Sequence, residues 1–77
     1  MNNAGMEILK IVSEVCAIDP EKIRKDADIY QEYGVDSMMA IKILAALDIQ
    51  YNIEISTEEA MKIRTLNELE KLVEKLV

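Results

Sequence analysis

The side chains that could do chemistry in this sequence are few, and they centre on one serine. The 77 residues include no histidine and a single cysteine, Cys16. Serine–histidine and cysteine–histidine pairs therefore have no base, and one cysteine cannot assemble a conventional zinc cluster. What remains is Asp36-Ser37, which follows Gly34 and opens an apolar run. A hydroxyl just inside a helix N-terminus lies where backbone amides and the helix dipole favour a bound phosphate.

The same dipeptide is also ordinary capping chemistry. The Asp36 carboxylate can accept hydrogen bonds from the free amides of a first helical turn. The residue types at Asp36 and Ser37 alone therefore leave a phosphate site and a plain helix cap both open.

A calcium site is the other chemistry that the spacing suggests. Asp26, Asp28 and Ser37 resemble the ligand positions of an EF-hand loop, but Gln31 stands at the glycine position and Tyr30 at a ligand position. Ser37 also takes the place of the bidentate glutamate. We therefore expect no metal site.

Helical periodicity predicts the first of the elements that position Ser37. An amphipathic helix covers residues 6–18, capped by Asn2 or Asn3, and ends near Asp19-Pro20. Its apolar stripe comprises Ile8, Ile11 or Val12, Val15 and Cys16. A helical turn at residues 20–23 and a long loop follow, and Ile23 and Ile29 are the expected anchors of this loop to the core.

The rest of the chain predicts three more helices. The second long helix begins at Asp36 and ends at Gln50 or Tyr51, a short third one covers STEEAMKI, and a fourth begins at Thr65. Capping boxes are predicted for Ser56 with Glu59 and for Thr65 with Glu68. The stripe of the last helix is Leu66, Leu69, Leu72, Val73 and Leu76. Residues 51–55 are the one short strand candidate. The sequence predicts an all-α fold, a small four-helix bundle of three longer helices and one short one.

The second long helix carries two apolar faces when it is wound at about 100° per residue. The first is a core arc of Ala40, Ile43, Leu44, Leu47 and Tyr51. Its width is that of one core-facing stripe. The opposite side, called the second face below, consists of Met38, Ile41, Ala45 and Ile49, with Lys42 among them and Ser37 and Asp48 at its edge. This face is expected to bind a partner, unless the long preceding loop covers it.

Composition restricts the classes of partner. Fifteen acids against nine bases give a net charge of −6, which argues against nucleic acid and anionic membranes and favours basic partners. The sequence shows no signal peptide, no internal disulfide and no apolar run of about 18 residues. We expect a cytoplasmic monomer that does not insert into a membrane.

The run GVDSMMAIKILAALDIQYNIEISTEEAMKIRTL, residues 34–66, resembles the acyl carrier proteins. In that family a serine within an Asp-Ser-Leu type motif opens the second of four helices, and here the motif is Asp36-Ser37-Met38. The likeness extends across essentially the whole chain, because helix order, the long first loop and the Glu-Glu-Ala-x-x-Ile pattern agree. The resemblance implies a single carrier domain, residues 1–77.

The resemblance implies a carrier and not an enzyme. Ser37 would receive a 4′-phosphopantetheine arm from coenzyme A through a separate magnesium-dependent phosphopantetheinyl transferase, and Asp36 would support this modification. The thiol of the arm would hold acyl groups as thioesters. The resemblance also implies an acyl pocket, whose matching residues are Ile43, Leu47, Ile55, Ala60 and Ile63. Ordinary core packing is the alternative for each of them.

The second helix departs from carriers of primary fatty-acid biosynthesis. Met39, Lys42 and Ile49 stand where those carriers often place acids, and Asp48 is the main acid left. Interface charges set association rates and reject wrong partners. We therefore expect a specialised carrier for a dedicated acyltransferase, ligase or synthase, in lipid, polyketide or surface-polymer synthesis. The expected partner-binding residues are Met38, Met39, Ile41, Lys42, Ala45, Asp48 and Ile49.

Two other classes remain open. An aminoacyl or peptidyl carrier, such as a D-alanyl carrier, would use the same serine. A non-carrier helical interaction module would use the second face and need neither Ser37 nor coenzyme A.

Overall fold

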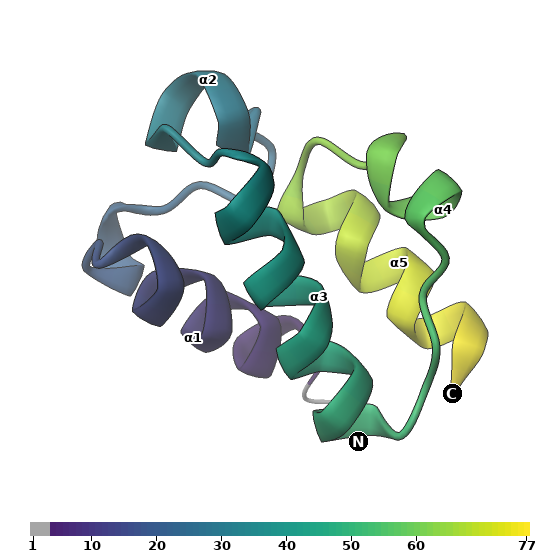
Figure 1. The fold of residues 1–77 in the computed structure, drawn as a ribbon. Helices are drawn as coiled ribbons and strands as arrows, with labels where there is room; N and C mark the ends of the chain where they lie inside the picture. The colour runs from purple at the N-terminus through teal and green to yellow at the C-terminus, as the bar shows by residue number, and fades with distance from the viewer. Residues whose placement is uncertain (1–3) are drawn as a thin grey trace.

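The computed structural model describes residues 4–77 and is all-α (Figure 1). Its longer helices are α1 (Ala4–Cys16), α3 (Ser37–Tyr51) and α5 (Leu66–Leu76). The connecting segments contain the short helices α2 (Ile29–Tyr33) and α4 (Thr57–Met61) and the 3₁₀ turn η1 (Pro20–Lys22). The predicted fold class is confirmed. Within residues 4–77 no helix has the length and apolar character needed to cross a membrane.

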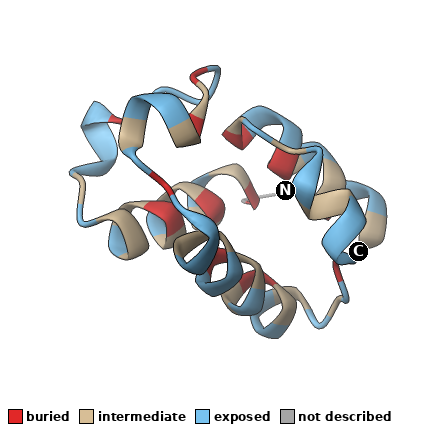
Figure 2. Cartoon of the chain, turned by 45° about the horizontal axis from the view of Figure 1, so that its top comes forward, coloured by how far each residue is buried: buried red, intermediate tan, exposed pale blue. Residues whose placement is uncertain are grey.

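The core lies where α1 packs against both α3 and α5, and the buried residues line the inner sides of these helices (Figure 2). The fully buried large side chains are Ile8, Val12, Leu47, Leu66 and Val73. Every residue of the predicted core arc of α3 is buried or packs against this cluster, as is every residue of the predicted stripe of α5. Helical periodicity therefore identified the core faces of both helices. The expected loop anchors Ile23 and Ile29 are also buried.

Helix α1 ends earlier than the sequence predicted. It stops at Cys16, and Ala17 adopts a left-handed conformation with φ 57°. The amide of Ile18 then donates to the carbonyl of Ser13 at 3.1 Å, which is a helix-terminating turn that needs no proline. The predicted cap at Asn2 or Asn3 lies outside the described residues.

The long loop between α1 and α3 contains a helix that the sequence analysis missed. Asp28 caps α2, because its carboxylate accepts from the amides of Tyr30 at 2.9 Å and Gln31 at 3.2 Å. Gly34 ends α2 in the left-handed conformation with φ 66°. A helix of five residues is too short to show a period, so its only signals were this aspartate cap and the glycine.

The strand candidate was wrong. Residue 51 is still helical, and Asn52 ends α3 with φ 53°. Residues 53–55 form no strand, and Asp48 accepts from two of their amides: its carbonyl accepts from Ile53 at 3.1 Å and its carboxylate from Ile55 at 3.2 Å. Asp48 thus fixes the connection from α3 to α4.

The predicted caps of the last two helices are present. Thr65 and Glu68 form a reciprocal capping box at the start of α5. At α4, the Ser56 hydroxyl accepts from the Glu59 amide at 3.1 Å and lies 3.1 Å from the Glu59 carboxylate. In a reciprocal capping box the glutamate carboxylate would accept from the backbone amide of Ser56. Here it accepts from the Ser56 hydroxyl instead.

Removing the α5 cap gives a stability prediction. Thr65→Ala is expected to lower the free energy of unfolding by about 1 kcal/mol, because the Glu68 amide loses its acceptor. Urea unfolding followed by circular dichroism measures the change. Thr57→Ala, at an exposed threonine that caps no helix, is the matched control and should change it by less than about 0.5 kcal/mol. Equal effects of the two substitutions would contradict the role of the cap.

Candidate functional site

Ser37 is the exposed first residue of α3. The Asp36 carboxylate accepts from the Met39 amide at 2.9 Å, and the Asp36 carbonyl accepts from the Ala40 amide at 2.9 Å. A helix start leaves the amides of Ser37 and Met38 without an intrahelical acceptor. The first turn of α3 contains no acidic side chain to compete for them. The serine hydroxyl therefore lies where a phosphate ester is electrostatically favoured.

The residues before the serine hold it at the surface. Gly34 adopts a positive φ that a side chain would strain, although no atom lies within 4 Å of where its Cβ would be. Val35 follows as a buried anchor, and its amide donates to the carbonyl of Ile29 at 3.3 Å. Asp36 and Ser37 then emerge exposed at the end of this short, fixed segment.

The second face of α3 is exposed. Met38, Ile41 and Ile49 retain 68%, 64% and 83% of their accessible surface, and Lys42 and Ala45 are exposed as well. The alternative that the preceding loop covers this face is therefore wrong. An apolar strip of this kind on a helix is characteristic of a surface that meets another protein.

Two residues predicted for the partner surface lie elsewhere. Met39 is half-buried and packs against the core cluster, because it follows Met38 by about 100° around the helix. Asp48 is half-buried at the other end of α3, where it holds residues 53–55. The exposed strip thus consists of Met38, Ile41, Ala45 and Ile49 with Lys42.

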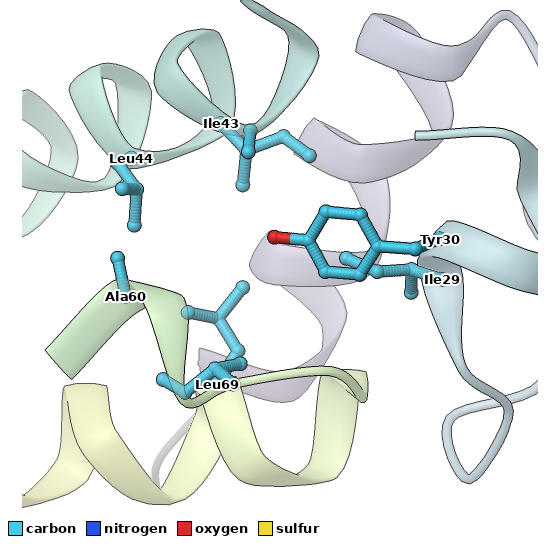
Figure 3. A pocket seen from close by; sticks show the side chains of 8 residues that line it. Ile29, Tyr30, Ile43, Leu44, Ala60 and Leu69 are labelled. Carbon is cyan, nitrogen blue, oxygen red and sulfur yellow. The ribbon is translucent and has the colours of Figure 1, made fainter. Parts of the chain in front are cut away.

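A small apolar cavity of about 30 Å³ lies between α2, α3, α4 and α5 (Figure 3). It is lined by Ile29, Tyr30, Ala40, Ile43, Leu44, Ala60, Ile63 and Leu69. Three of the predicted pocket residues, Ile43, Ala60 and Ile63, are among them. Leu47 and Ile55 do not line it and are buried in the core instead. Tyr30 was missed because the helix that positions it was missed.

A larger hollow of about 290 Å³ lies between this cavity and the serine. Its lining includes Ser37 and Ile41 from α3 and Met61 from α4. It shares four lining residues with the cavity, namely Tyr30, Ala40, Leu44 and Ala60. The mostly apolar hollow therefore extends from Ser37, on the α3–α4 side of the molecule, to residues that also line the cavity.

Tyr30, at the boundary between the hollow and the cavity, is held in place by two charged residues. The Arg64 Nε donates to Asp28 Oδ2 at 2.6 Å, and the guanidinium lies 5.0 Å from the centre of the Tyr30 ring. Asp28 also accepts from the Tyr30 amide. The hydrogen bond from Arg64, followed by those from the backbone, lowers the pKa of Asp28, and the same pair raises the pKa of Arg64.

The lowered pKa of Asp28 sets the sign of a pH effect. A carboxyl whose pKa is lower in the folded state adds stability above its ordinary pKa and loses that contribution as the pH falls through the lowered value. Asp28→Asn, which keeps a capping side chain, should therefore be less stable than the wild type at neutral pH, and the difference should shrink as the pH falls from neutral through the lowered pKa of Asp28. Urea midpoints across this range measure the difference.

Asp26→Asn is the matched control. Asp26 is largely exposed, and its contact with Arg24 is 4.0 Å long. Its replacement should leave the neutral midpoint nearly unchanged. A loss as large as that of Asp28→Asn would contradict the importance of the Arg64 pair.

Within residues 4–77 no group of three or more histidine, cysteine or acidic side chains is placed to hold a metal ion.

The chain is similar to known proteins over most of its length. The family model described as "Phosphopantetheine attachment site" matches residues 7–73. The chain is 37% identical over 75 residues to the acyl carrier protein of Buchnera aphidicola subsp. Acyrthosiphon pisum (strain Tuc7). The aligned residues cover 97% of this chain and 94% of that relative. It is 32% identical over 74 residues to the acyl carrier protein of Cylindrotheca sp. (strain N1), covering 96% and 92%. It is 31% identical over 68 residues to that of Wolinella succinogenes, covering 88% and 90%.

Proposed function

Because the chain belongs to the acyl carrier protein family, whose prosthetic group is 4′-phosphopantetheine, we propose that Ser37 is the residue that carries this arm. The observation that supports it most is the joint position of Ser37. It is exposed, it opens α3 beside unpaired amides, and it lines the apolar hollow. The chain has two other serines, Ser13 and Ser56. Ser13 lies half-buried within α1, and Ser56 is occupied as the cap of α4.

The chemistry of attachment requires an external enzyme. The Ser37 hydroxyl oxygen forms the new ester bond to phosphorus while the pyrophosphate linkage of coenzyme A breaks and adenosine 3′,5′-bisphosphate leaves. In this proposal the transferase supplies the base that takes the hydroxyl proton, and the chain has no histidine that could do so. Asp36 uses Oδ1 to hold the helix start, and we assign its exposed carboxylate a second role toward the magnesium ion of the transferase.

The thiol at the end of the arm supplies the thioester to which acyl cargo is attached. The apolar hollow and cavity give a bound acyl group a place out of water, with Ile43, Ala60 and Ile63 as lining residues, while Leu47 and Ile55 belong to the buried core cluster. A volume of about 30 Å³ is close to the space of one water molecule. A longer acyl chain therefore has to lie in the hollow or separate α3 from α4.

The exposed strip of α3 supports a specialised set of partner enzymes. A strip of Met38, Ile41, Ala45 and Ile49 offers apolar contact, and Lys42 is its one charge. An enzyme that recognises carriers through a basic patch would meet repulsion from Lys42 and find no acid on this strip. The fitting partner is an acyltransferase, ligase or synthase whose docking surface is apolar and not strongly basic.

Charge reversal at Lys42 tests this specialisation. A ketosynthase of primary fatty-acid synthesis should use the loaded wild type with a lower kcat/KM than it shows for an ordinary acidic-helix carrier. Lys42→Glu should raise that kcat/KM several-fold, most at low ionic strength, because long-range attraction acts on the association rate. Lys10→Glu, at an exposed lysine on α1, makes the same change in net charge away from the strip and is the control. Wild-type efficiency equal to that of the ordinary carrier would sink the specialised assignment.

Attachment itself is tested by intact mass. Incubation of the purified chain with coenzyme A, magnesium and a broad-specificity phosphopantetheinyl transferase should add the mass of one phosphopantetheinyl group. No gain in mass would overturn the proposed function.

A further inference from the structure

The hydroxyl of Tyr30 is a polar group that the carrier role leaves unexplained. The chain has three tyrosines. The hydroxyl of Tyr33 accepts from the Arg24 amide at 2.7 Å, and that of Tyr51 donates to Glu7 at 2.6 Å. The hydroxyl of Tyr30 forms no hydrogen bond with any described residue, and it points into the space between Ile43, Leu44 and Leu69 (Figure 3). The hydroxyl is accessible to water, because no buried side-chain oxygen or nitrogen of the described residues lacks a hydrogen-bond partner.

The position of this hydroxyl is fixed from outside the cavity. Asp28 caps the helix that carries Tyr30, and the Arg64 guanidinium, paired with Asp28, lies over the ring. A planar guanidinium on an aromatic face restrains the ring more than an aliphatic neighbour would. The ring is thereby held where its hydroxyl faces the cavity and its edge borders the hollow that begins at Ser37.

The surroundings of the hydroxyl determine what it can select. The other seven residues that line the cavity are alanine, leucine and isoleucine. An alkyl chain that enters would shield the hydroxyl from water without offering it a hydrogen bond, which is unfavourable. A chain with an oxygen at that depth would satisfy it. A volume of about 30 Å³ has room for little more than the oxygen-bearing part of a cargo, so the rest of a short chain would lie in the adjoining hollow.

We infer that the cavity and the adjoining hollow together select a short acyl cargo bearing a keto or hydroxyl oxygen, which hydrogen-bonds to the hydroxyl of Tyr30. The inference rests on the proposed attachment of the arm at Ser37. From Ser37 to Leu44 is seven residues, or roughly 10 Å along the axis of α3. An arm that folds back along the hollow can span this distance.

The test compares two cargoes with equal numbers of carbon atoms. A transferase loads the wild type, Tyr30→Phe and Tyr33→Phe from butyryl-coenzyme A or from 3-hydroxybutyryl-coenzyme A. The measurement is the rate of thioester cleavage by hydroxylamine, divided by the rate for the same acyl group on free pantetheine. This ratio removes the intrinsic reactivity of each thioester and reports how far the protein shelters it.

The wild type should protect 3-hydroxybutyryl about threefold to tenfold more than butyryl, the range of one neutral hydrogen bond. Tyr30→Phe keeps the ring and should lose this preference, while Tyr33→Phe, which removes a hydroxyl bonded elsewhere, should keep it. Equal protection in the wild type, or an unchanged preference in Tyr30→Phe, overturns the inference. Intact mass distinguishes failure of the inference from failure of the proposed function. If the arm is attached but the wild type protects both cargoes equally, only the inference is overturned. If no arm is attached, the proposed function is overturned as well.

Discussion

Replacing Ser37 with alanine should remove all transfer of the phosphopantetheinyl group to the chain, while the protein should stay folded. The loss is complete because the ester oxygen itself is gone, and none of the remaining serines combines exposure with a helix start and an apolar hollow. The fold persists because Ser37 is exposed and the cap of α3 is supplied by Asp36. Its circular dichroism should match the wild type, and its free energy of unfolding should change by less than about 0.5 kcal/mol.

Ser13→Ala is the matched control for this result. It removes a hydroxyl from the middle of α1 and should gain the same mass as the wild type when incubated with coenzyme A, magnesium and transferase. A mass gain on Ser37→Ala equal to that of the wild type would show that another residue carries the arm.

Replacing Leu47 with alanine should lower the free energy of unfolding by about 3 kcal/mol. Leu47 is fully buried on the core side of α3, where α1 packs against that helix. The substitution removes buried methyl groups and leaves a void that well-packed neighbours fill only in part. For a chain of this size that is a large share of the total stability. Urea unfolding at neutral pH measures it.

Ile49→Ala, two residues further along α3, is the matched control. Ile49 is 83% exposed, so its truncation should cost less than about 0.5 kcal/mol. Instead it should weaken binding to the enzymes that use the exposed strip. Similar stability losses at Leu47 and Ile49 would contradict the assignment of α3 to two faces with different roles.

The sequence could predict what depends on local pattern. The core arc of α3 and the stripe of α5 followed from a 3.6-residue period, and the caps at Asp36, Ser56 and Thr65 followed from residue type and spacing. These features depend on groups within one turn of each other. Their physical causes are therefore visible in a single stretch of sequence.

The structural features that could not be predicted from the sequence depend on tertiary contacts. Helix α2 is stabilised by a cap, a glycine and the bond between the Ile29 amide and the distant Arg64 carbonyl at 2.9 Å. Tyr30 is held at the cavity in part by Asp28 and Arg64, which meet across 36 positions of the chain. Likewise, Leu47 and Ile55 could not be separated from true lining residues, since side chains in the core and in a cavity have the same apolar character.

The measurement that tests the central claim most directly is a peptide map of the wild type after modification. The chain is incubated with coenzyme A, magnesium and a phosphopantetheinyl transferase, digested, and fragmented by tandem mass spectrometry. We expect one phosphopantetheinyl group per chain, on the fragment that contains Ser37 and bonded to that residue. Finding the group on Ser13, Ser56 or any other residue, or finding none, would contradict the assignment of this chain's arm to Ser37.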